Sequence, residues 1–299
     1  MTIVFAMLLD AIFGEPKALW NRVPHPAVLM GKCVDLIDEE FNRGNFKKAK
    51  GILAFGGLVI AFGLLGVLIT MLPTHIPEII IGAILIAHKS LIDHVNAVAD
   101  ALGRSVADGR KAVSMIVGRD TSEMDEPAVS RAAIESAAEN FSDGIIAPVF
   151  WFVILGLPGL LIYKITNTAD SMIGYRTSRH QEFGWAAARF DDVLNWAPAR
   201  LTAGLFWCLN PRNIDLPSIK RDAALHRSPN AGWPEAAMSR LLGVALAGPR
   251  AYHGTLKDFP WVNASGRTDA TALDIRASTG ILWQAWVIAL GVVTLIAYL

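Results

Sequence analysis

Three acidic residues recur every four positions in the segment RAAIESAAENFSDG: Glu135, Glu139 and Asp143. Asp125 can cap a helix over 126–142, which would place the three carboxylates on one face with Asn140 beside them. Such a stripe is typical of a solvated helix face, but carboxylate and amide oxygens are also the ligands that Mg²⁺ prefers. An uncharged run begins at Gly144. It would place the acids at the mouth of a cavity, which favours the metal site.

A second polar cluster follows that run in the segment YKITNTADSMIGYR. If its helix continues, Asn167, Asp170 and Ser171 share one face, with Lys164 at the edge of that face. A single lysine here is typical of a side chain that extends to the membrane surface. Together with an amide and an acid, Lys164 favours a polar site that lines a pocket.

A third cluster, DDVLNWAPAR, contains the adjacent acids Asp191 and Asp192, with Asn195 and Arg200 downstream. Adjacent aspartates usually face solvent. Trp185, Trp196 and Trp207 around this cluster indicate an interfacial amphipathic helix instead. Acids that face the protein from such a helix need compensating partners.

Two loops could bind phosphate. The segment HRSPNAGWPE places His226, Arg227, Ser228 and Asn230 in one turn, where the Arg227 guanidinium can bind phosphate or carboxylate in a bidentate manner. The segment GRDT places Arg119 and Asp120 in a similar tight loop. An ordinary surface turn is the alternative in both cases, although a turn rarely needs His, Arg, Ser and Asn together.

Long uncharged runs indicate the elements that position these residues. Residues 51–72, 144–163 and 281–299 contain no ionisable side chain apart from Tyr163 and Tyr298, and each approaches the ~20 residues that cross a bilayer. Charged residues make up only 18% of the 299-residue chain. We therefore predict an all-α polytopic integral membrane protein with re-entrant or broken helices and a cytoplasmic helical lobe, formed as a single domain over 1–299.

The distribution of lysine and arginine predicts the topology. We expect membrane runs at 2–13, 51–72, 78–100, 144–163 and 281–299, with the lobe at 210–280. A full crossing by 144–163 would place cation-rich stretches on opposite sides of the membrane, against the positive-inside rule. Gly156, Pro158 and Gly159 interrupt that run, so we predict a re-entrant hairpin that returns the chain to the cytoplasmic side.

Composition excludes several other classes of protein. The 27 basic and 27 acidic residues balance, which leaves no cationic excess for binding nucleic acid. The two cysteines, Cys33 and Cys208, cannot form a disulfide scaffold or a thiolate zinc site. The chain contains no P-loop signature and no Rossmann glycine pattern.

Together these segments, with Leu9-Asp10, Gly14-Glu15-Pro16 and His25-Pro26 near the N-terminus, resemble the adenosylcobinamide-phosphate synthase (CobD/CbiB) family of cobalamin biosynthesis over essentially the whole chain. The HRSPNAG loop is the most specific of the motifs. The resemblance implies an ATP-dependent ligase that joins the carboxylate of adenosylcobyric acid to (R)-1-amino-2-propanol phosphate or ethanolamine phosphate. It also implies ATP and Mg²⁺ as cofactors, a multi-pass location in the cell (inner) membrane with the active site facing the cytoplasm, and contact with other enzymes of the pathway.

Chemistry of this kind would use the residues in three roles. We expect catalytic roles for Lys164, Asn167, Asp170 and Arg227. We expect metal binding by Glu135, Glu139, Asp143, Asp191 and Asp192. We expect phosphate or substrate binding by Arg119, Asp120, Asn140, Ser171, Arg176, Asn195, Arg200, His226, Ser228 and Asn230.

Two other functions remain open at this point. A membrane transporter would also have broken helices, but its polar residues would lie near the bilayer midplane. A noncatalytic membrane regulator on the same scaffold would be expected to lack the acid clusters and the 226–235 loop.

Overall fold

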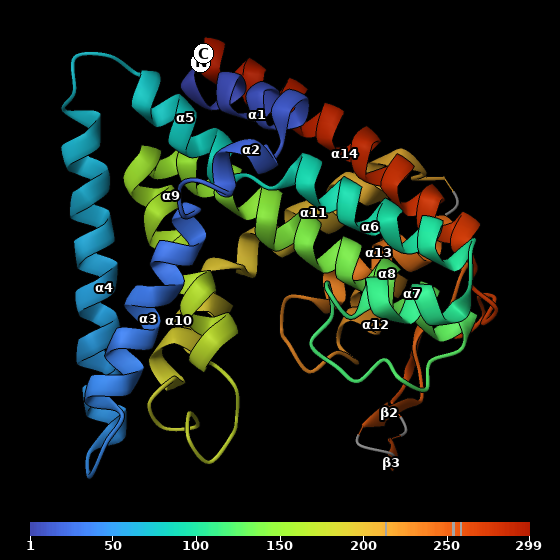
Figure 1. Ribbon diagram of the computed structural model, residues 1–299. Helices are drawn as coiled ribbons and strands as arrows, with labels where there is room; N and C mark the ends of the chain where they lie inside the picture. Colours follow the sequence, from blue (N-terminus) through green and yellow to red (C-terminus); the bar gives the residue numbers. More distant parts are fainter. Residues whose placement is uncertain (213, 253–254, 258) are drawn as a thin grey trace. The chain divides into compact units, whose positions relative to one another are not determined.

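Helices account for most of the chain in a computed structural model, which describes residues 1–212, 214–252, 255–257 and 259–299 (Figure 1). The helices form two units. One unit comprises Met1–Lys89, Asp143–Trp196 and Val293–Leu299, and the other comprises Ser90–Ser142 and Ala197–Val292. The all-α prediction is confirmed, whereas a single domain over 1–299 stays a prediction.

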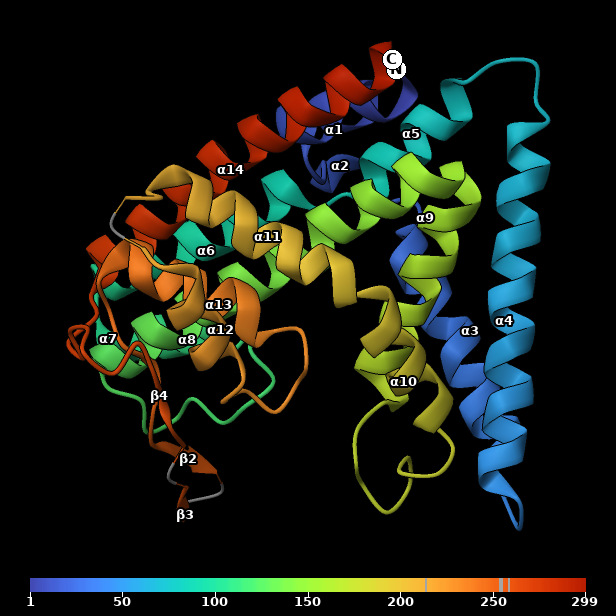
Figure 2. The ribbon, with the colours of Figure 1, turned by 180° about the vertical axis from the view of Figure 1, so that it is seen from behind.

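The first unit contains α1 (Thr2–Phe13), α2 (Lys17–Trp20), α3 (Pro26–Phe41), α4 (Lys47–Thr70), α5 (Ile76–Leu85), α9 (Ala147–Ile173) and α10 (Trp185–Leu194). Within it, α9 packs against α3, α4 and α10, and α1 packs against α5 (Figures 1 and 2). The predicted run 2–13 matches α1, which at ~18 Å is too short to cross a bilayer alone.

The second unit contains α6 (His88–Leu102), α7 (Val106–Val113), α8 (Glu126–Phe141), α11 (Trp196–Leu209), α12 (Leu216–Ala223), α13 (Gly232–Leu242) and most of α14 (Ala272–Tyr298). It also contains two antiparallel ribbons: β1 (Leu246–Ala247) with β4 (Trp261–Val262), and β2 (Arg250–Tyr252) with β3 (Thr255–Lys257). The helix α13 packs against both α8 and α12. Residues 210–280, predicted as a helical lobe, contain the short helices α12 and α13 together with these ribbons, and the ribbons were not predicted.

Among the residues that the structure describes, three helical stretches are long and apolar enough to cross a membrane, judged by length and composition: Lys47–Thr70, Glu126–Ile173 and Ala272–Tyr298. Large apolar side chains of α4 point away from the protein, and Leu53 and Ile60 are 77% and 64% exposed. A helix that leaves such a face uncovered is suited to lipid.

The second of these stretches is broken where the sequence predicts it. Gly156 has φ 65° and ψ −157°, a left-handed conformation that interrupts α9 and that favours glycine. After the break, Gly159 lies so close to the first arm of α9 that a Cβ would come within 2.4 Å of the Trp151 carbonyl oxygen. Gly66 of α4 abuts Pro158 in the same way, with only 2.6 Å between its ideal Cβ and the Pro158 Cα.

The two arms of α9 bring the ends of the apolar run together. The Tyr163 hydroxyl lies 2.9 Å from the carbonyl oxygen of Asp143, and the Tyr163 ring packs with Ala147. Twenty residues of straight helix would separate Asp143 from Tyr163 by ~30 Å. The run 144–163 therefore folds back on itself, as a re-entrant hairpin requires, although its length and composition alone would permit a crossing.

The membrane run predicted at 78–100 is not one continuous helix. Ile86 adopts an extended conformation after α5, and α6 begins at His88. The buried carboxylate of Asp10 accepts a hydrogen bond from the backbone N–H of His88 at 2.9 Å. A side chain from α1 thus accepts the hydrogen bond of a backbone N–H at the start of α6. The break between α5 and α6 therefore does not leave this buried donor unpaired.

Candidate functional site

The predicted site residues divide between the two units. The first unit holds Asp143, Lys164, Asn167, Asp170, Ser171, Arg176, Asp191, Asp192 and Asn195. The second unit holds Arg119, Asp120, Glu135, Glu139, Asn140, Arg200, His226, Arg227, Ser228 and Asn230. Each group is described within its own unit.

A hydrogen-bonded network in the first unit joins α9 to α10. The buried Asp191 accepts a hydrogen bond from Asn195 Nδ2 at 2.9 Å, and Asn167 Nδ2 lies 3.4 Å from its other carboxylate oxygen. The Tyr163 hydroxyl lies 3.0 Å from Asn195 Oδ1 and completes the network. Two segments that the sequence analysis treated separately therefore converge on one carboxylate.

Two neighbouring acids of α10 are costly to ionise. Burial raises the pKa of Asp191 to about 7, and the charge of Asp170 adds to the rise, while hydrogen bonds from Asn195 and Asn167 oppose it. Burial also raises the pKa of Asp192, against the opposing charges of Arg189 and Arg176. Acids that are costly to ionise together are stabilised by a divalent cation between them.

Lys164 lies on the second arm of α9, after the break at Gly156. The carboxylates whose charges act on it are those of Asp143 and Glu15. His25 joins the same group: burial lowers the pKa of His25, Glu15 raises it, and Lys164 lowers it further. The Nδ1 atom of His25 accepts a hydrogen bond from the Ala27 N–H and caps α3. This cap holds the imidazole in place next to the lysine.

The donor set of the first unit fits Mg²⁺ without forming a complete cage. Among the residues described, no three His, Cys, Asp or Glu side chains come together as a metal-binding group. Magnesium is commonly held by one or two carboxylates, and water and substrate phosphates complete its octahedron. Asp170 and Asp191, with the neighbouring amides of Asn167 and Asn195, are a set of this kind. Metal binding by the five acids stays a prediction, and the described residues do not form a complete metal-binding group.

In the second unit, Glu135 is engaged by protein groups. Its carboxylate pairs with Arg119 Nη2 at 3.0 Å and accepts a hydrogen bond from the backbone N–H of Ala247 at 2.7 Å. Both side chains of the pair are largely buried. The alternative of a solvated helix face therefore does not hold at Glu135, because the helix packs against the ribbon strand β1.

The stripe of three acids is interrupted after α8. Asp125 caps α8 as predicted, by accepting a hydrogen bond from the Ala128 N–H. A five-residue π-helical turn, Ser142–Ile146, follows the helix and carries Asp143 into the first unit. Glu139 is half-buried on α8, and Asn140 Nδ2 donates back to the Ser136 carbonyl. Asp120 is exposed and accepts a hydrogen bond from the Ser122 N–H.

The 226–235 turn is ordered by its own polar side chains. Ser228 Oγ accepts hydrogen bonds from the backbone N–H groups of Asn230 and Ala231, and His226 Nδ1 accepts one from the Ser228 N–H. Arg200 Nη1 donates to Asn230 Oδ1 at 3.1 Å. The turn is thus a preorganised structure and no ordinary flexible surface loop.

A small cavity lies beside this turn. Its volume is about 160 Å³, and its lining includes His226, Arg227, Ala247 and Phe259. The Arg227 guanidinium lies 4.6 Å from the centre of the Phe259 ring. Ala247 lines this cavity, and its backbone N–H donates to Glu135, so the α8 carboxylate and the 226–235 turn both lie near one backbone segment.

The remaining predicted residues are more exposed. Ser171 is exposed and donates to the Asn167 carbonyl, and Arg176 is exposed in the loop after α9. The charge of Arg176 acts on Asp192, so it lies near the acidic group of the first unit.

Sequence reasoning missed Tyr163 as a member of the site. In the sequence, Tyr163 is only the last residue of the apolar run 144–163, and its partners Asp143 and Asn195 are 20 and 32 residues away. It also gave no role to Glu15 or His25. The signal available in the sequence was that Glu15 and His25 lie shortly after the apolar run 2–13.

Comparisons with known proteins identify the family to which the chain belongs. The sequence pattern described as CobD/Cbib protein matches residues 3–282. The chain belongs to the CobD/CbiB family. A relative from Rhizobium meliloti (strain 1021), named cobalamin biosynthesis protein CobD, is 46% identical over 95% of this chain and 93% of its own length. A protein of the same name from Brucella suis biovar 1 is 48% identical over 96% of this chain and 94% of its own length. A third, from Rhodobacter capsulatus, is 46% identical over 88% of this chain and 86% of its own length. No solved structure matches the chain.

Membership in the CobD/CbiB family covers both units, because the matched region includes the Asp191 network and the 226–235 turn. Each CobD relative aligns over most of its own length, so the chain is comparable to them as a whole.

Proposed function

We propose that the protein is an ATP-dependent amide ligase. It would join the carboxylate of adenosylcobyric acid to the amine of (R)-1-amino-2-propanol phosphate, or of ethanolamine phosphate, and release adenosylcobinamide phosphate, ADP and inorganic phosphate. The relatives are named as cobalamin biosynthesis proteins, which favours a biosynthetic enzyme over a transporter or a noncatalytic regulator.

The reaction needs activation of the carboxylate. A carboxylate oxygen attacks the γ-phosphorus of ATP, the bond to the bridging oxygen breaks, and ADP leaves with that electron pair. The neutral amine then attacks the acyl carbon, phosphate leaves, and the amine nitrogen loses a proton to give the amide. Both steps move negative charge over phosphoryl oxygens, so cationic groups near those oxygens lower the barrier.

The Asp191 network carries this proposal. It gathers two carboxylates and two amides from α9 and α10 beside the base of the hairpin, and Lys164 lies near the same base next to Asp143 and Glu15. Bound Mg²⁺ would neutralise phosphate charge there. Lys164 would hold a phosphoryl oxygen, and Asn167 and Asn195 would orient Asp191.

The second unit would bind phosphate-bearing substrate. Arg227 and His226, which line the wall of a small cavity, would form an anion-binding surface there. Arg119 and Arg200 would position this surface, since Arg119 holds Glu135 and Arg200 holds Asn230.

We place the protein in the cell (inner) membrane as a multi-pass protein with this site on the cytoplasmic side, where ATP is present. Its partners would then be the corrinoid, the amino-alcohol phosphate, the bilayer and neighbouring enzymes of the pathway. The uncovered apolar face of α4 and the lysine and arginine residues between the apolar runs support this placement.

Reconstitution with purified components tests the activity. The detergent-solubilised protein is mixed with adenosylcobyric acid, (R)-1-amino-2-propanol phosphate, ATP and Mg²⁺, and the amide and ADP are quantified by mass spectrometry. We expect one ADP per amide and no product without ATP. Asp170→Asn should lower turnover at least ~100-fold, while the exposed Asp269→Asn should not change it. Amide formation that consumes no ATP, or full turnover by Asp170→Asn, would contradict the proposal.

A further inference from the structure

A basic segment, residues 42–50, connects α3 to the first turn of α4 in the first unit (Figure 1). It reads NRGNFKKAK and contains no acid, and its four cations are Arg43, Lys47, Lys48 and Lys50. The uncharged run of α4 begins directly after it, at Gly51. The cations therefore stand where a helix with exposed apolar side chains meets the membrane surface.

The protein does not neutralise the charge of the basic segment. Among the residues described, none of its four cations forms an ion pair, and the nearby Asp38 is paired with Arg179 instead. The acids nearest along the chain are the exposed Glu39 and Glu40 on the last turn of α3, and two acids do not balance four cations. The segment thus presents an uncompensated positive charge to an outside partner.

Two of the lysines are held in defined positions. Lys50 Nζ donates to the carbonyl oxygen of Arg43 at 2.7 Å and closes the turn between the helices. Lys48 Nζ lies 4.0 Å from the centre of the Trp185 ring at the start of α10, and this tryptophan is 41% exposed. Because partly exposed tryptophans prefer the headgroup level of a bilayer, the contact indicates that Lys48 lies at that level.

Phe46 is exposed in a strained conformation at the centre of the basic segment. It precedes α4 with φ 61° and ψ 33°, a left-handed conformation that is costly for a residue with a side chain. Its side chain is 82% exposed, so packing against the protein does not offset this cost. An aromatic ring held outward among cations is typical of a membrane-surface anchor.

We propose that the basic segment binds the headgroup of an anionic phospholipid in the leaflet at this end of α4. The lipid phosphate would accept hydrogen bonds from Arg43 and Lys47, and the Phe46 ring would lie against the lipid at the glycerol level. A zwitterionic headgroup fits less well, because its own ammonium group is repelled by the cations.

This lipid site goes beyond a location in the membrane. The apolar face of α4 is covered equally well by any phospholipid, since acyl chains carry no charge. A preference for one class of headgroup has to come from the basic segment. The site is also independent of the proposed ligase reaction, so a binding experiment without substrates tests it.

Native mass spectrometry of the full-length protein in detergent micelles tests the inference. The probes are phosphatidylglycerol and phosphatidylcholine with identical acyl chains, added in equal amounts. Both carry a phosphate diester, but only phosphatidylcholine carries a compensating ammonium group. We expect bound phosphatidylglycerol to exceed bound phosphatidylcholine by ~10-fold or more, since each cation near an anionic surface contributes about 5-fold in affinity. Equal binding of the two lipids would overturn the inference and indicate an acidic protein segment as the occupant instead.

Two triple variants with the same change in net charge locate the site. The first replaces cations of the basic segment: Arg43→Gln, Lys47→Gln and Lys48→Gln. The control replaces exposed cations of the second unit: Lys111→Gln, Arg212→Gln and Lys220→Gln. We expect the lipid preference to fall to ~2-fold or less in the first variant and to persist in the control. A preference that persists in the first variant, or that disappears in both, would overturn the inference.

Phe46→Gly separates the lipid contact from a structural role of the ring. Glycine adopts the left-handed conformation without cost, so the melting temperature in lipid-free micelles should not fall. Binding of phosphatidylglycerol should weaken by ~3-fold or more, because the apolar contact of the ring is lost. Unchanged lipid binding in this variant would overturn the assignment of Phe46 to the site.

Discussion

Replacing Asp191 with asparagine should change how stability depends on pH. Asp191 is buried at the centre of the first-unit network, and its pKa rises from 3.8 to about 7. Because this pKa is higher in the folded protein than in the unfolded chain, the folded state binds more protons between pH 4 and 7. Its stability therefore falls as pH rises through that range.

The size of the effect follows from the pKa. A rise from 3.8 to about 7, at about 1.4 kcal/mol per pH unit, corresponds to about 4 kcal/mol. Asparagine cannot ionise, so the variant should lack this loss. At ~2 °C per kcal/mol, the melting temperature of Asp191→Asn relative to wild type should rise by ~8 °C between pH 4 and 7 and stay level above pH 7.

Thermal unfolding in detergent, followed by tryptophan fluorescence from pH 4 to 8, measures this difference. Asp269→Asn, at an exposed position, serves as the control and should track the wild type. A melting-temperature difference for Asp191→Asn that does not change with pH would refute the assignment of a buried, protonated Asp191. Addition of Mg²⁺ above pH 7 should stabilise the wild type and leave the variant less affected, because the metal competes with the proton for this carboxylate.

Three further changes test other parts of the structure. Tyr163→Phe should lower the unfolding free energy by ~1–2 kcal/mol, since it leaves Asn195 and the Asp143 carbonyl without the hydroxyl; an unchanged melting temperature would argue against the hairpin contact. Gly156→Ala should destabilise by ~1–2 kcal/mol because φ is 65° there, whereas Gly57→Ala, with open space around it, should be neutral or stabilising; equal melting temperatures for the two variants would contradict the break. Arg119→Gln should cost ~3 kcal/mol by leaving the Glu135 carboxylate buried without its cation, and a melt within ~0.5 kcal/mol of wild type would contradict that pairing.

The sequence predicted those elements that depend on residues close to one another in the chain. The cap at Asp125, the helix that follows it and the break at Gly156 all depend on residues within a few positions of one another. The uncharged runs predicted α4 and the apolar part of α14 for the same reason, since hydropathy is a property of the segment itself.

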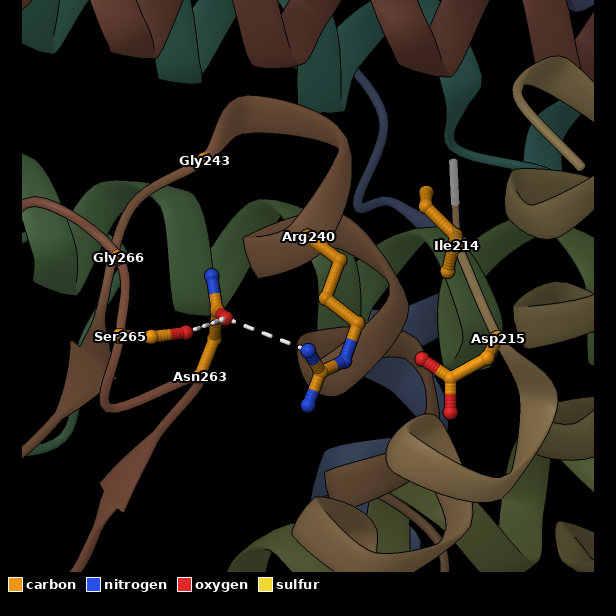
Figure 3. Close-up of a pocket in the computed structure, with 7 residues that line it drawn as sticks. All are labelled: Ile214, Asp215, Arg240, Gly243, Asn263, Ser265 and Gly266. Carbon is orange, nitrogen blue, oxygen red and sulfur yellow. Dashed lines mark hydrogen bonds between the residues drawn. The ribbon is translucent and has the colours of Figure 1, made fainter. Parts of the chain in front are cut away.

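Long-range partners could not be inferred in this way. Asp10 interrupts an apolar run and looks like a defect in a membrane helix, but it accepts a hydrogen bond from a backbone N–H 78 residues away. Glu135 fits a metal stripe by its spacing, whereas its partners Arg119 and Ala247 come from a loop and from β1. No spacing rule predicts that Arg240 and Asp215 line one cavity either (Figure 3), because this depends on how α12, α13 and the loop after β4 meet.

The central claim is that the apolar run 144–163 returns to the side it left, which would keep the charged stretches before and after it on the cytoplasmic side. Side-specific labelling of single cysteines tests it most directly. Cys33 and Cys208 are replaced by serine, and one cysteine is introduced at Met115 or at Ser178, both of which are exposed. Labelling with a membrane-impermeant maleimide in right-side-out and inside-out vesicles should modify both positions from the cytoplasmic face only. Modification of Met115 and Ser178 from opposite faces would contradict the re-entrant hairpin and the one-sided site that depends on it.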